Sequence, residues 1–451
     1  MSDTYPTIEE GTPPEQILSV PIAVIDTSLQ LDTAQDAAVK MCIDLKKRIC
    51  AVTGPAGTGK TTIMKQVAHA LQTAGYRVVA CAPTGKAARR IREATGLESM
   101  TIHRLLRYPF PGERDAKTGE SLRPGFPQHD RFNPIPYDIV LADEYAMVNH
   151  EVHSNLVDAL PARGCLRAFG DVNQLSPIES IVTMQAESPF QKILRTFPNM
   201  RLETNHRQGE GSGIIAAGFD ILKGRGPKRT SDFNIKITDK PVETLTDVIM
   251  EGLDLGFDFR TLDYQVITPT RKSWVGTAKL NLTLQMLLNP DMKGAQVLPR
   301  HSWAIDKNTR VAAGDKVIWT VNNYDLNIFN GETGIIEECT ELGEIIINWG
   351  DRTVCVPPSL AVTRKDGSLA YVDPRKDIDL AYAVTTHKSQ GSEFKQVIYV
   401  LNKSCIFMQD SANYYTAITR ARNAVTLICD QQSFFAALRK PQPKAKKGLD
   451  Q

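Results

Sequence analysis

Apolar and polar positions alternate along the chain in a way that predicts a parallel α/β fold. Four short apolar runs have the length of buried strands: Ile49–Val52, Val78–Cys81, Ile139–Ala142 and Leu166–Phe169. Helix-like stretches such as Thr61–Thr73 and Lys86–Thr95 lie between them. Because strands alternate with helices, we expect a parallel sheet covered on both faces. A second series begins near residue 200, with strand candidates Met200–Glu203, Gln265–Thr268, Val397–Leu401 and Ala424–Cys429.

Two segments interrupt this alternation. Residues 107–136 are rich in Pro, Gly and charged residues, with a turn signal at 117–119, which predicts a surface insertion shaped as a hairpin. Residues 311–357 contain short β-rich runs separated by Asn330-Gly331, Leu342-Gly343 and Gly350-Asp351. Such runs predict a small antiparallel barrel or sheet inserted into the second α/β series.

Net charge, cysteine spacing and the length of apolar runs exclude several classes of protein but do not identify one. The 451 residues carry a net charge of +2, so a nucleic-acid partner would have to be held by local patches. Eight cysteines lack the paired spacing of a zinc site, which indicates reduced thiols and a cytoplasmic protein. Residues 1–30 read as a loose leader without a secretory signal, and the basic residues 440–451 read as a disordered tail. No apolar run reaches the roughly 18 residues of a membrane span.

The segment GPAGTGKT at 54–61 matches the phosphate-binding loop G-x-x-x-x-G-K-[ST]. It follows a predicted strand and precedes a predicted helix, which is the context that the motif requires. Its glycines let backbone N–H groups face a phosphate, Lys60 supplies a positive charge, and Thr61 offers a hydroxyl to Mg²⁺. The predicted nucleotide-binding residues here are Gly54, Pro55, Ala56, Gly57, Thr58, Gly59, Lys60, Thr61 and Thr62.

A pair of acids follows the apolar run that ends at Ala142. At this position Asp143 is expected to hold Mg²⁺, and Glu144 is expected to polarise the attacking water. The alternative is a solvated acidic pair at the start of a helix. These features indicate a P-loop ATPase, but kinases, transporters and motors share them.

Further segments resemble, in order, the motifs of superfamily-one DNA helicases of the RecD-like and Dda-like branch. They are LDTAQDAAV (31–39), CAPTGKAARRI (81–91), SMTIHRLL (99–106), LADEYAMV (141–148), GDVNQLSPI (170–178), LETNHRQ (202–208), AYAVTTHKSQGSEF (381–394) and YTAITRAR (415–422). The resemblance spans roughly residues 30–430 and implies two RecA-like P-loop domains. It also implies that 107–136 forms a strand-separating pin and that the β-rich insertion closes over single-stranded DNA.

The resemblance assigns roles around the nucleotide. It implies that Gln35 reads adenine, that His206 stacks on it, and that Glu393 contacts the ribose. Gln174 would couple the γ-phosphate to the DNA side, and Arg207 and Arg420 would reach the γ-phosphate from the second domain. Alternatively, Gln174 is a polar loop residue and the arginines form structural ion pairs. Two positions depart from the family pattern: Tyr145 follows the acids, and His206 replaces a more usual tyrosine.

The DNA candidates come from both halves of the chain. They are Pro83, Thr84, Lys86, Thr101, His103, Thr386, His387, Lys388 and Ser389. Hydroxyls and basic groups at strand ends suit the DNA backbone, which a motor should grip independently of sequence. Lys86 shares a helix face with Arg89 and Arg90, which could equally be a solvated surface. Phe126 is the preferred pin aromatic, with Phe110 and Phe132 as alternatives, and Tyr324 and Phe329 are weaker candidates.

Together these observations predict a monomeric, ATP- and Mg²⁺-dependent DNA helicase, with 5′→3′ polarity implied by the branch alone. We expect a first domain at 31–200 and a second at 201–439, with a barrel inserted at about 300–375. Expected partners are single-stranded DNA, a duplex fork, and single-strand binding, replication or recombination proteins, in a bacterial or phage-infected cytoplasm. Two alternatives remain: a RecD-like motor subunit of a recombination nuclease complex, or a nucleotide-gated DNA-binding protein that does not unwind.

Overall fold

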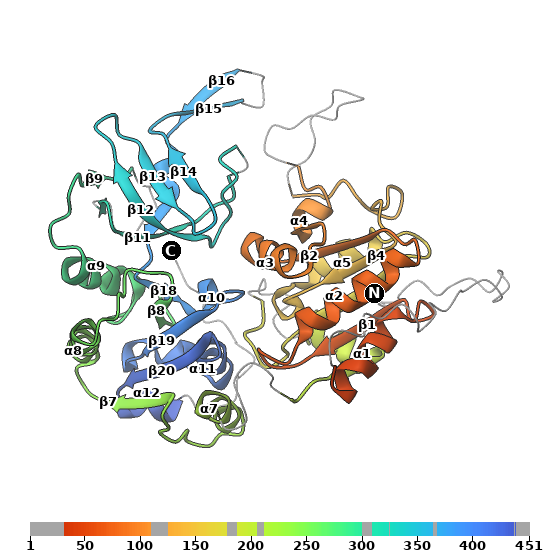
Figure 1. Ribbon diagram of the computed structural model, residues 1–451, viewed down its shortest axis with the longest axis horizontal. Helices are drawn as coiled ribbons and strands as arrows, with labels where there is room; N and C mark the ends of the chain where they lie inside the picture. Colours follow the sequence, from red (N-terminus) through yellow and green to blue (C-terminus); the bar gives the residue numbers. More distant parts are fainter. Residues whose placement is uncertain are drawn as a thin grey trace.

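The computed structural model describes residues 31–109, 125–177, 187–204, 212–299, 309–323, 325–363, 368–436 and 438. They form two α/β halves and a β-rich region above the second half (Figure 1). The predicted leader 1–30, the tail 440–451 and residues 110–124 of the predicted insertion lie outside the described residues. No helix in the described part of the chain is both long and apolar enough to cross a membrane.

The first half is a six-stranded parallel sheet in the order β3-β2-β4-β5-β1-β6. Its strands are β1 Ile49–Thr53, β2 Val78–Ala82, β3 Ser99–Thr101, β4 Ile139–Ala142, β5 Cys165–Gly170 and β6 Asn199–Arg201. The four predicted buried strands are confirmed as β1, β2, β4 and β5. All four are buried along their whole length, because helices cover both faces of the sheet.

One strand prediction is wrong in its partner. The run near residue 200 was expected to open the second sheet, but β6 pairs in parallel with β1 at the edge of the first sheet. Leu202 N–H then donates to the Thr53 carbonyl, and the Leu202 side chain is buried in the core of the first half. The apolar pattern identified a strand, but it carried no information about the sheet to which the strand adds.

Helices cover the two faces of the first sheet in two groups. The first group packs on one core and consists of α1 Thr33–Ile43, α2 Lys60–Thr73 and α3 Gly85–Thr95. The second group packs on a second core and consists of α4 Ile102–Leu105, α5 His150–Asp158 and α6 Pro189–Thr196, together with the 3₁₀ turn η3 Tyr145–Met147. Polar N-caps begin α1, α3, α5 and α6, where Asp32, Thr84, Asn149 and Ser188 accept backbone N–H groups.

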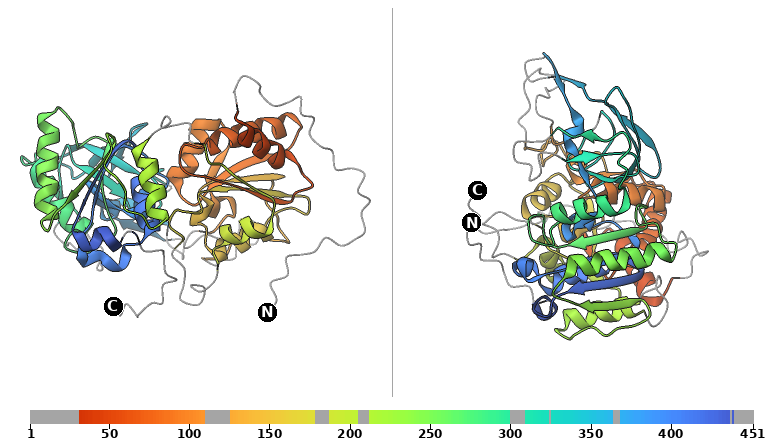
Figure 2. Two further views of the ribbon diagram at one scale, coloured as in Figure 1. Left: turned by 90° about the horizontal axis from the view of Figure 1, so that it is seen from below. Right: turned by 90° about the vertical axis from the view of Figure 1, so that its left-hand side faces the viewer.

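The second half is a five-stranded parallel sheet in the order β18-β8-β19-β20-β7. Its strands are β7 Phe233–Ile237, β8 Tyr264–Thr268, β18 Ala383–Thr385, β19 Phe394–Val400 and β20 Ala421–Cys429. The helices α8 Pro241–Asp254 and α9 Thr277–Leu288 lie on one side of it (Figure 2). The other helices are α7 Gly213–Leu222, α10 Thr386–Ser389, α11 Ser411–Ile418 and α12 Gln431–Ala436, with the 3₁₀ turn η5 Lys403–Met408.

The predicted antiparallel insertion is confirmed as a five-stranded sheet in the order β14-β13-β12-β11-β17. Its strands are β11 Lys316–Trp319, β12 Thr333–Cys339, β13 Ile345–Asn348, β14 Thr353–Val356 and β17 Ile378–Leu380, and residues 316–380 are called the β-insert below. It also carries the hairpin β15 Leu360–Thr363 and β16 Leu369–Val372 and the 3₁₀ turn η4 Pro374–Asp377. A short pair, β9 Gln296–Val297 with β10 Arg310–Val311, precedes it.

The β-insert shares a hydrophobic core with the second sheet. Trp319 and Trp349 meet edge to face within it, with ring centroids 6.4 Å apart. Lys316 is also buried here, and its ammonium group donates to the Thr261 and Tyr264 carbonyls. The two sheets therefore form one packed body, against which the first half lies.

Candidate functional site

The phosphate-loop residues connect the carboxyl end of β1 to the first turn of α2. Gly57 and Gly59 have φ angles of 85° and 83°, a left-handed conformation that a residue with a Cβ adopts only at a cost. The Lys60 ammonium group donates to the Gly54 carbonyl at 2.7 Å and to the Pro55 carbonyl at 2.8 Å. The loop therefore curls around Lys60 and holds its positive charge near the carboxyl end of β1.

Asp143 and Glu144 follow β4, two strands away from β1 in the sheet. Burial, together with the neighbouring Glu144, raises the pKa of the Asp143 carboxyl to about 6, although Lys60 opposes the shift. The Asp143 carboxylate accepts the Glu144 N–H at 2.8 Å. Glu144 has a φ angle of 50°, so its backbone is strained where the two acids leave the strand.

Oxygen donors suited to Mg²⁺ are present at this edge. The Asp143 carboxylate and the Thr61 hydroxyl are hard ligands, and Mg²⁺ commonly takes one or two such groups and fills its remaining positions with water and phosphate. Among the described residues there is no group of three or more His, Cys, Asp or Glu side chains that could hold a metal. The Asp143 and Thr61 oxygens fit a magnesium ion that is bound together with a nucleotide.

A narrow cleft separates the phosphate loop from the second half. Pro55 and Ala56 line it on one side, and Ile214, Phe219, Tyr415 and Thr419 are among the residues opposite. Arg420 lies next to this wall and is buried, and its guanidinium donates to the Thr416 carbonyl at 3.1 Å. Two predicted phosphate-loop residues, Pro55 and Ala56, thus face the chain neighbours of Arg420 across one cleft.

The loop after β5 is tied directly to α11 of the second half. The Tyr415 hydroxyl donates to Asp171 at 2.7 Å, and the Leu175 N–H donates to the Thr416 hydroxyl at 2.9 Å. The Gln390 amide donates to the Leu175 carbonyl at 3.2 Å. Between these contacts, the Gln174 side chain is buried and its Oε1 atom has no hydrogen-bond partner in the described part of the structure. A buried acceptor in this position is suited to a ligand that donates a hydrogen bond.

Two predicted nucleotide contacts are engaged elsewhere in this conformation. Both ends of the Gln35 amide are used: its oxygen accepts the Asp32 N–H at 3.1 Å, and its nitrogen donates to the Thr58 carbonyl at 3.2 Å. Gln35 therefore links the phosphate loop to the first turn of α1, because the same side chain bonds to both. Glu393 pairs with Arg90 on α3 and with Arg422, so its carboxylate is directed at α3. Contacts of Gln35 with adenine and of Glu393 with a ribose would require these bonds to open.

The first-half DNA candidates lie at the ends of β2 and β3. The Thr84 hydroxyl caps α3 by accepting the Ala87 N–H, and the Thr101 hydroxyl caps α4 by accepting the Arg104 N–H. Each hydroxyl keeps its own proton to donate. Pro83 precedes Thr84, and the exposed His103 ring lies 4.9 Å from the Tyr108 ring. Phe126 and Phe132 are 64% and 88% exposed, which suits a stacking role better than a packing role.

The second-half DNA candidates divide into two groups. His387 and Lys388 are partly exposed on α10, next to a cleft of about 640 Å³. Thr386 and Ser389, in contrast, are fully buried, and their hydroxyls donate to Asn413 and to the Thr386 carbonyl. In this conformation the helical turn directs both side chains into the core, where they hold α10 in place, so their predicted contact with DNA stays a prediction.

The structure adds residues that the motif comparison did not single out. Arg271 follows β8 and lines the same cleft as Lys388, and both cations face Asp379, at 3.5 and 4.0 Å. Trp274 is exposed beside them, with the Lys279 ammonium group 3.2 Å from its ring centroid. The sequence signal was a basic and aromatic run, TRKSW, directly after a predicted strand. His206, Arg207, Phe110 and Tyr324 lie outside the described residues.

The unusual Tyr145 has a structural environment. Its ring is fully buried against Phe190, and its hydroxyl forms a hydrogen bond of 2.8 Å with His153 Nδ1.

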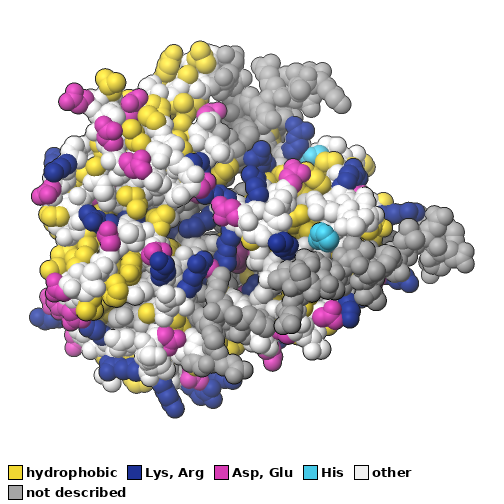
Figure 3. Space-filling view, in the orientation of Figure 1, with side chains coloured by type: hydrophobic (Ala, Val, Ile, Leu, Met, Phe, Trp, Pro, Cys, Tyr) yellow, Lys and Arg dark blue, Asp and Glu magenta, His cyan; other side chains and the backbone are white. Residues whose placement is uncertain are grey.

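The eight cysteines form no disulfide, and six of them are buried. Lys and Arg side chains appear on both sides of the boundary between the two halves, with Asp and Glu side chains among them (Figure 3).

Comparisons with known proteins identify the same segments. Residues 30–235 match the AAA domain model, residues 280–349 match the SH3 domain of ATP-dependent RecD-like DNA helicases, and residues 380–428 match the UvrD-like helicase C-terminal domain. The chain is 31% identical over 379 residues to the ATP-dependent RecD2 DNA helicase of Deinococcus radiodurans, covering 83% of this chain and 46% of that protein. The chain thus spans about half the length of that relative.

Two further similarities extend over most of the chain. It is 26% identical to the RecBCD enzyme subunit RecD of Mycolicibacterium smegmatis, covering 91% of this chain and 73% of that protein. The fold is similar to the crystal structure of a Bacteroides Pif1 helicase in complex with ADP-AlF3 and single-stranded DNA, with a TM-score of 0.57, 19% identity and coverage of 92% and 95% of the two chains. The predicted fold class, two RecA-like sheets with an inserted β-domain, is confirmed. The chain is thus similar in sequence to RecD-like DNA helicases over most of its length, and its likeness to the Pif1 structure concerns the fold.

Proposed function

We propose that this chain is an ATP-driven motor that moves along single-stranded DNA in the 5′→3′ direction and separates duplex DNA. One observation carries the proposal. Gln174 is buried in the loop after β5 with its Oε1 atom unpartnered in the described part of the structure, and its neighbours Asp171 and Leu175 bond to α11 of the other half. A change at the nucleotide would therefore be transmitted to the position of the second half.

Five of the predicted nucleotide-site residues that the structure describes would each have a role in hydrolysis. Lys60 would exchange its bonds to loop carbonyls for the β- and γ-phosphates, and Glu144 would orient the attacking water. Thr61 and Asp143 would hold Mg²⁺, which neutralises phosphate charge when it is bound. Arg420, with Arg207, would stabilise the charge that develops on the γ-phosphate. Because Arg420 comes from the second half, hydrolysis would require the two halves to be engaged.

The DNA path would cross both halves. Pro83, Thr84, Thr101 and His103 would bind the backbone on the first half, and His387, Lys388 and Arg271 would bind it on the second. Asp379 lies between Arg271 and Lys388, so a phosphate would compete with it for both cations. Exposed Phe126 would contact a base at the fork, and Trp274 could stack on the bound strand.

The test is ATP hydrolysis with and without single-stranded DNA, in wild type and in two variants of α2. Lys60→Ala should lose at least about a hundredfold in rate, because it removes a charge that stabilises the transition state. Lys65→Ala is the matched control, since Lys65 is an exposed lysine of the same helix. Full ATPase activity in Lys60→Ala would falsify the nucleotide-site assignment.

A second function is favoured by the similarity to RecD, which extends over 91% of this chain. On that proposal the chain is the motor subunit of a recombination nuclease complex and acts with partner proteins. Co-purification from its host separates the two proposals, because a motor that acts alone would not bring nuclease subunits with it. A DNA-binding protein that does not unwind is the remaining alternative, and it would bind DNA without strand displacement.

A further inference from the structure

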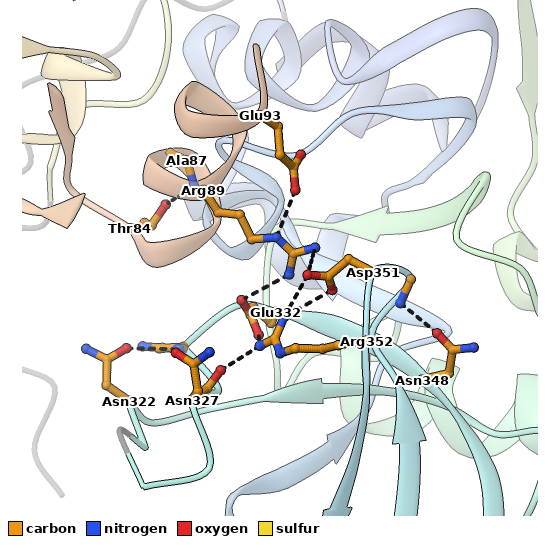
Figure 4. Close-up of polar contacts among 12 residues, drawn as sticks. Thr84, Ala87, Arg89, Glu93, Asn322, Asn327, Glu332, Asn348, Asp351 and Arg352 are labelled. Atoms are coloured by element: carbon orange, nitrogen blue, oxygen red, sulfur yellow. Dashed lines mark hydrogen bonds and ion pairs between the residues drawn. The ribbon is translucent and has the colours of Figure 1, made fainter. Parts of the chain in front are cut away.

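The β-insert is held against α3 of the first half by a cluster of four charged residues. Arg89 on α3 contacts Asp351 at 2.5 Å and Glu332 at 3.7 Å, both on the β-insert. Arg352 completes the cluster by contacting Glu332 at 2.7 Å and Asp351 at 3.1 Å (Figure 4). The two carboxylates thus neutralise a cation on the helix that follows the Pro83-Thr84 DNA candidates.

A nonpolar contact lies beside this Arg89 cluster. Phe329 packs on Gly85, the first residue of α3, so closely that a Cβ added to Gly85 would lie 2.5 Å from the Phe329 Cβ. The same loop is anchored to the cluster, because Arg352 donates to the Asn327 carbonyl at 2.6 Å. The ion pairs and the phenylalanine therefore belong to one structural unit, and they should form and break together.

This unit covers the part of α3 that DNA is proposed to use. Gly85 directly follows Thr84, and the N-terminal end of an 11-residue helix favours a phosphate group. Phe329 occupies the space over that turn. Asp351 and Glu332 form ion pairs with Arg89, which could otherwise bind phosphate oxygens. Behind the contact lies an open pocket lined by residues of α3, the β-insert and residues 391–394.

We propose that Phe329 and the Arg89 cluster form an autoinhibitory latch, in which the β-insert covers α3 until a single strand of nucleic acid displaces it. The proposal rests on the proposed function, because it assumes that the strand crosses Pro83–Gly85. Partly exposed ion pairs are individually weak, because water and salt screen them. The latch is therefore strong enough to bias the closed position and weak enough for phosphates to open it.

The first test measures how fast the protein binds a fluorescein-labelled oligothymidylate in the absence of nucleotide. Phe329→Ala and Asp351→Asn should each associate roughly three- to fivefold faster than wild type, as expected from loss of one weak contact. Phe329→Ala changes no charge, so general attraction to DNA cannot produce the increase. Glu337→Gln is the matched control for Asp351→Asn, because Glu337 is a carboxylate of the same sheet that contacts Asn348 instead of α3.

The second test locks the latch in place. Gly85→Cys with Phe329→Cys, in a Cys355→Ser background that removes the exposed cysteine, should form a disulfide after a shift of roughly 1.3 Å, given the usual Cβ separation of about 3.8 Å. The oxidised protein should bind the oligothymidylate at least about tenfold more weakly than the same protein after reduction.

The outcomes separate the latch from the proposed function. Association of Phe329→Ala that is no faster than wild type, or equal binding by oxidised and reduced protein, would overturn the latch. Wild-type protein that fails to bind the strand at all would instead refute the proposed function, whatever the variants do.

Discussion

The bond between Tyr415 and Asp171 offers the sharpest test of coupling between the two halves. Tyr415→Phe removes the hydroxyl that donates to Asp171 at 2.7 Å across the interface and leaves the ring in place. The other Asp171 oxygen still accepts the Asn173 N–H at 3.0 Å. A hydrogen bond to a charged group contributes about 1.5 to 3 kcal/mol, which corresponds to roughly a ten- to hundredfold change in the equilibrium between engaged and separated halves.

The assay is DNA-stimulated ATP hydrolysis as a function of ATP concentration. Tyr415→Phe should lower kcat/KM for ATP by about tenfold or more, because fewer molecules have Arg420 at the cleft. Tyr414→Phe is the control: Tyr414 is equally buried, but its hydroxyl donates to the Ser433 carbonyl within the second half. It should change kcat/KM by no more than about twofold, because the interface remains intact.

The pH profile adds an independent signature. Burial raises the pKa of Asp171, and the Tyr415 hydroxyl opposes that shift. Removing the hydroxyl should raise the pKa of Asp171 further, so that the carboxyl is protonated at higher pH and the acid limb of the ATPase profile moves upward. Equal losses in Tyr415→Phe and Tyr414→Phe, with unchanged pH profiles, would show that the Tyr415–Asp171 bond does not couple the two halves.

Three other predictions concern separate residues. Burial lowers the pKa of Lys86 to about 8, so affinity for single-stranded DNA should fall as pH rises through 8, and Lys86→Arg should flatten the dependence when dissociation constants are measured at pH 7 and 9. Tyr145→Phe should cost about 1 kcal/mol of unfolding free energy in urea, through loss of the bond to His153, and leave ATPase activity unchanged. Phe126→Ala should lower strand displacement more than translocation on single strands, and equal losses would count against a role at the fork.

Much of the fold was readable from local pattern. Runs such as Ile49–Val52 and Ile139–Ala142 are apolar throughout because helices cover both faces of their sheet, so continuous hydrophobicity marked them. Short strands were missed because of their length: β17 and β18 have three residues each, too few to show a pattern of apolar and polar positions. β17 also extends the β-insert to Leu380, beyond the predicted end near 375, because it pairs with β11 across a long connection.

The site was predictable where chemistry is local and not where it depends on packing. The surroundings of two segments, residues 54–61 and Asp143-Glu144, are set by their own sequence. The first is a glycine-rich turn after β1, and the second lies at the end of β4. The burial of Thr386 and Ser389 depends on how α10 packs against Asn413, and the pairing of Glu393 with Arg90 depends on the position of the second half. Neither is encoded in the neighbouring sequence.

The most direct measurement of the central claim is strand displacement from duplexes with a 5′ or a 3′ single-stranded tail, with and without ATP. We expect ATP-dependent displacement of the 5′-tailed duplex only, abolished by Lys60→Ala and retained by Lys65→Ala. Displacement from the 3′ tail alone would contradict the polarity. Failure to displace either strand, together with ATP hydrolysis that DNA does not stimulate, would contradict the claim that this chain is a DNA motor.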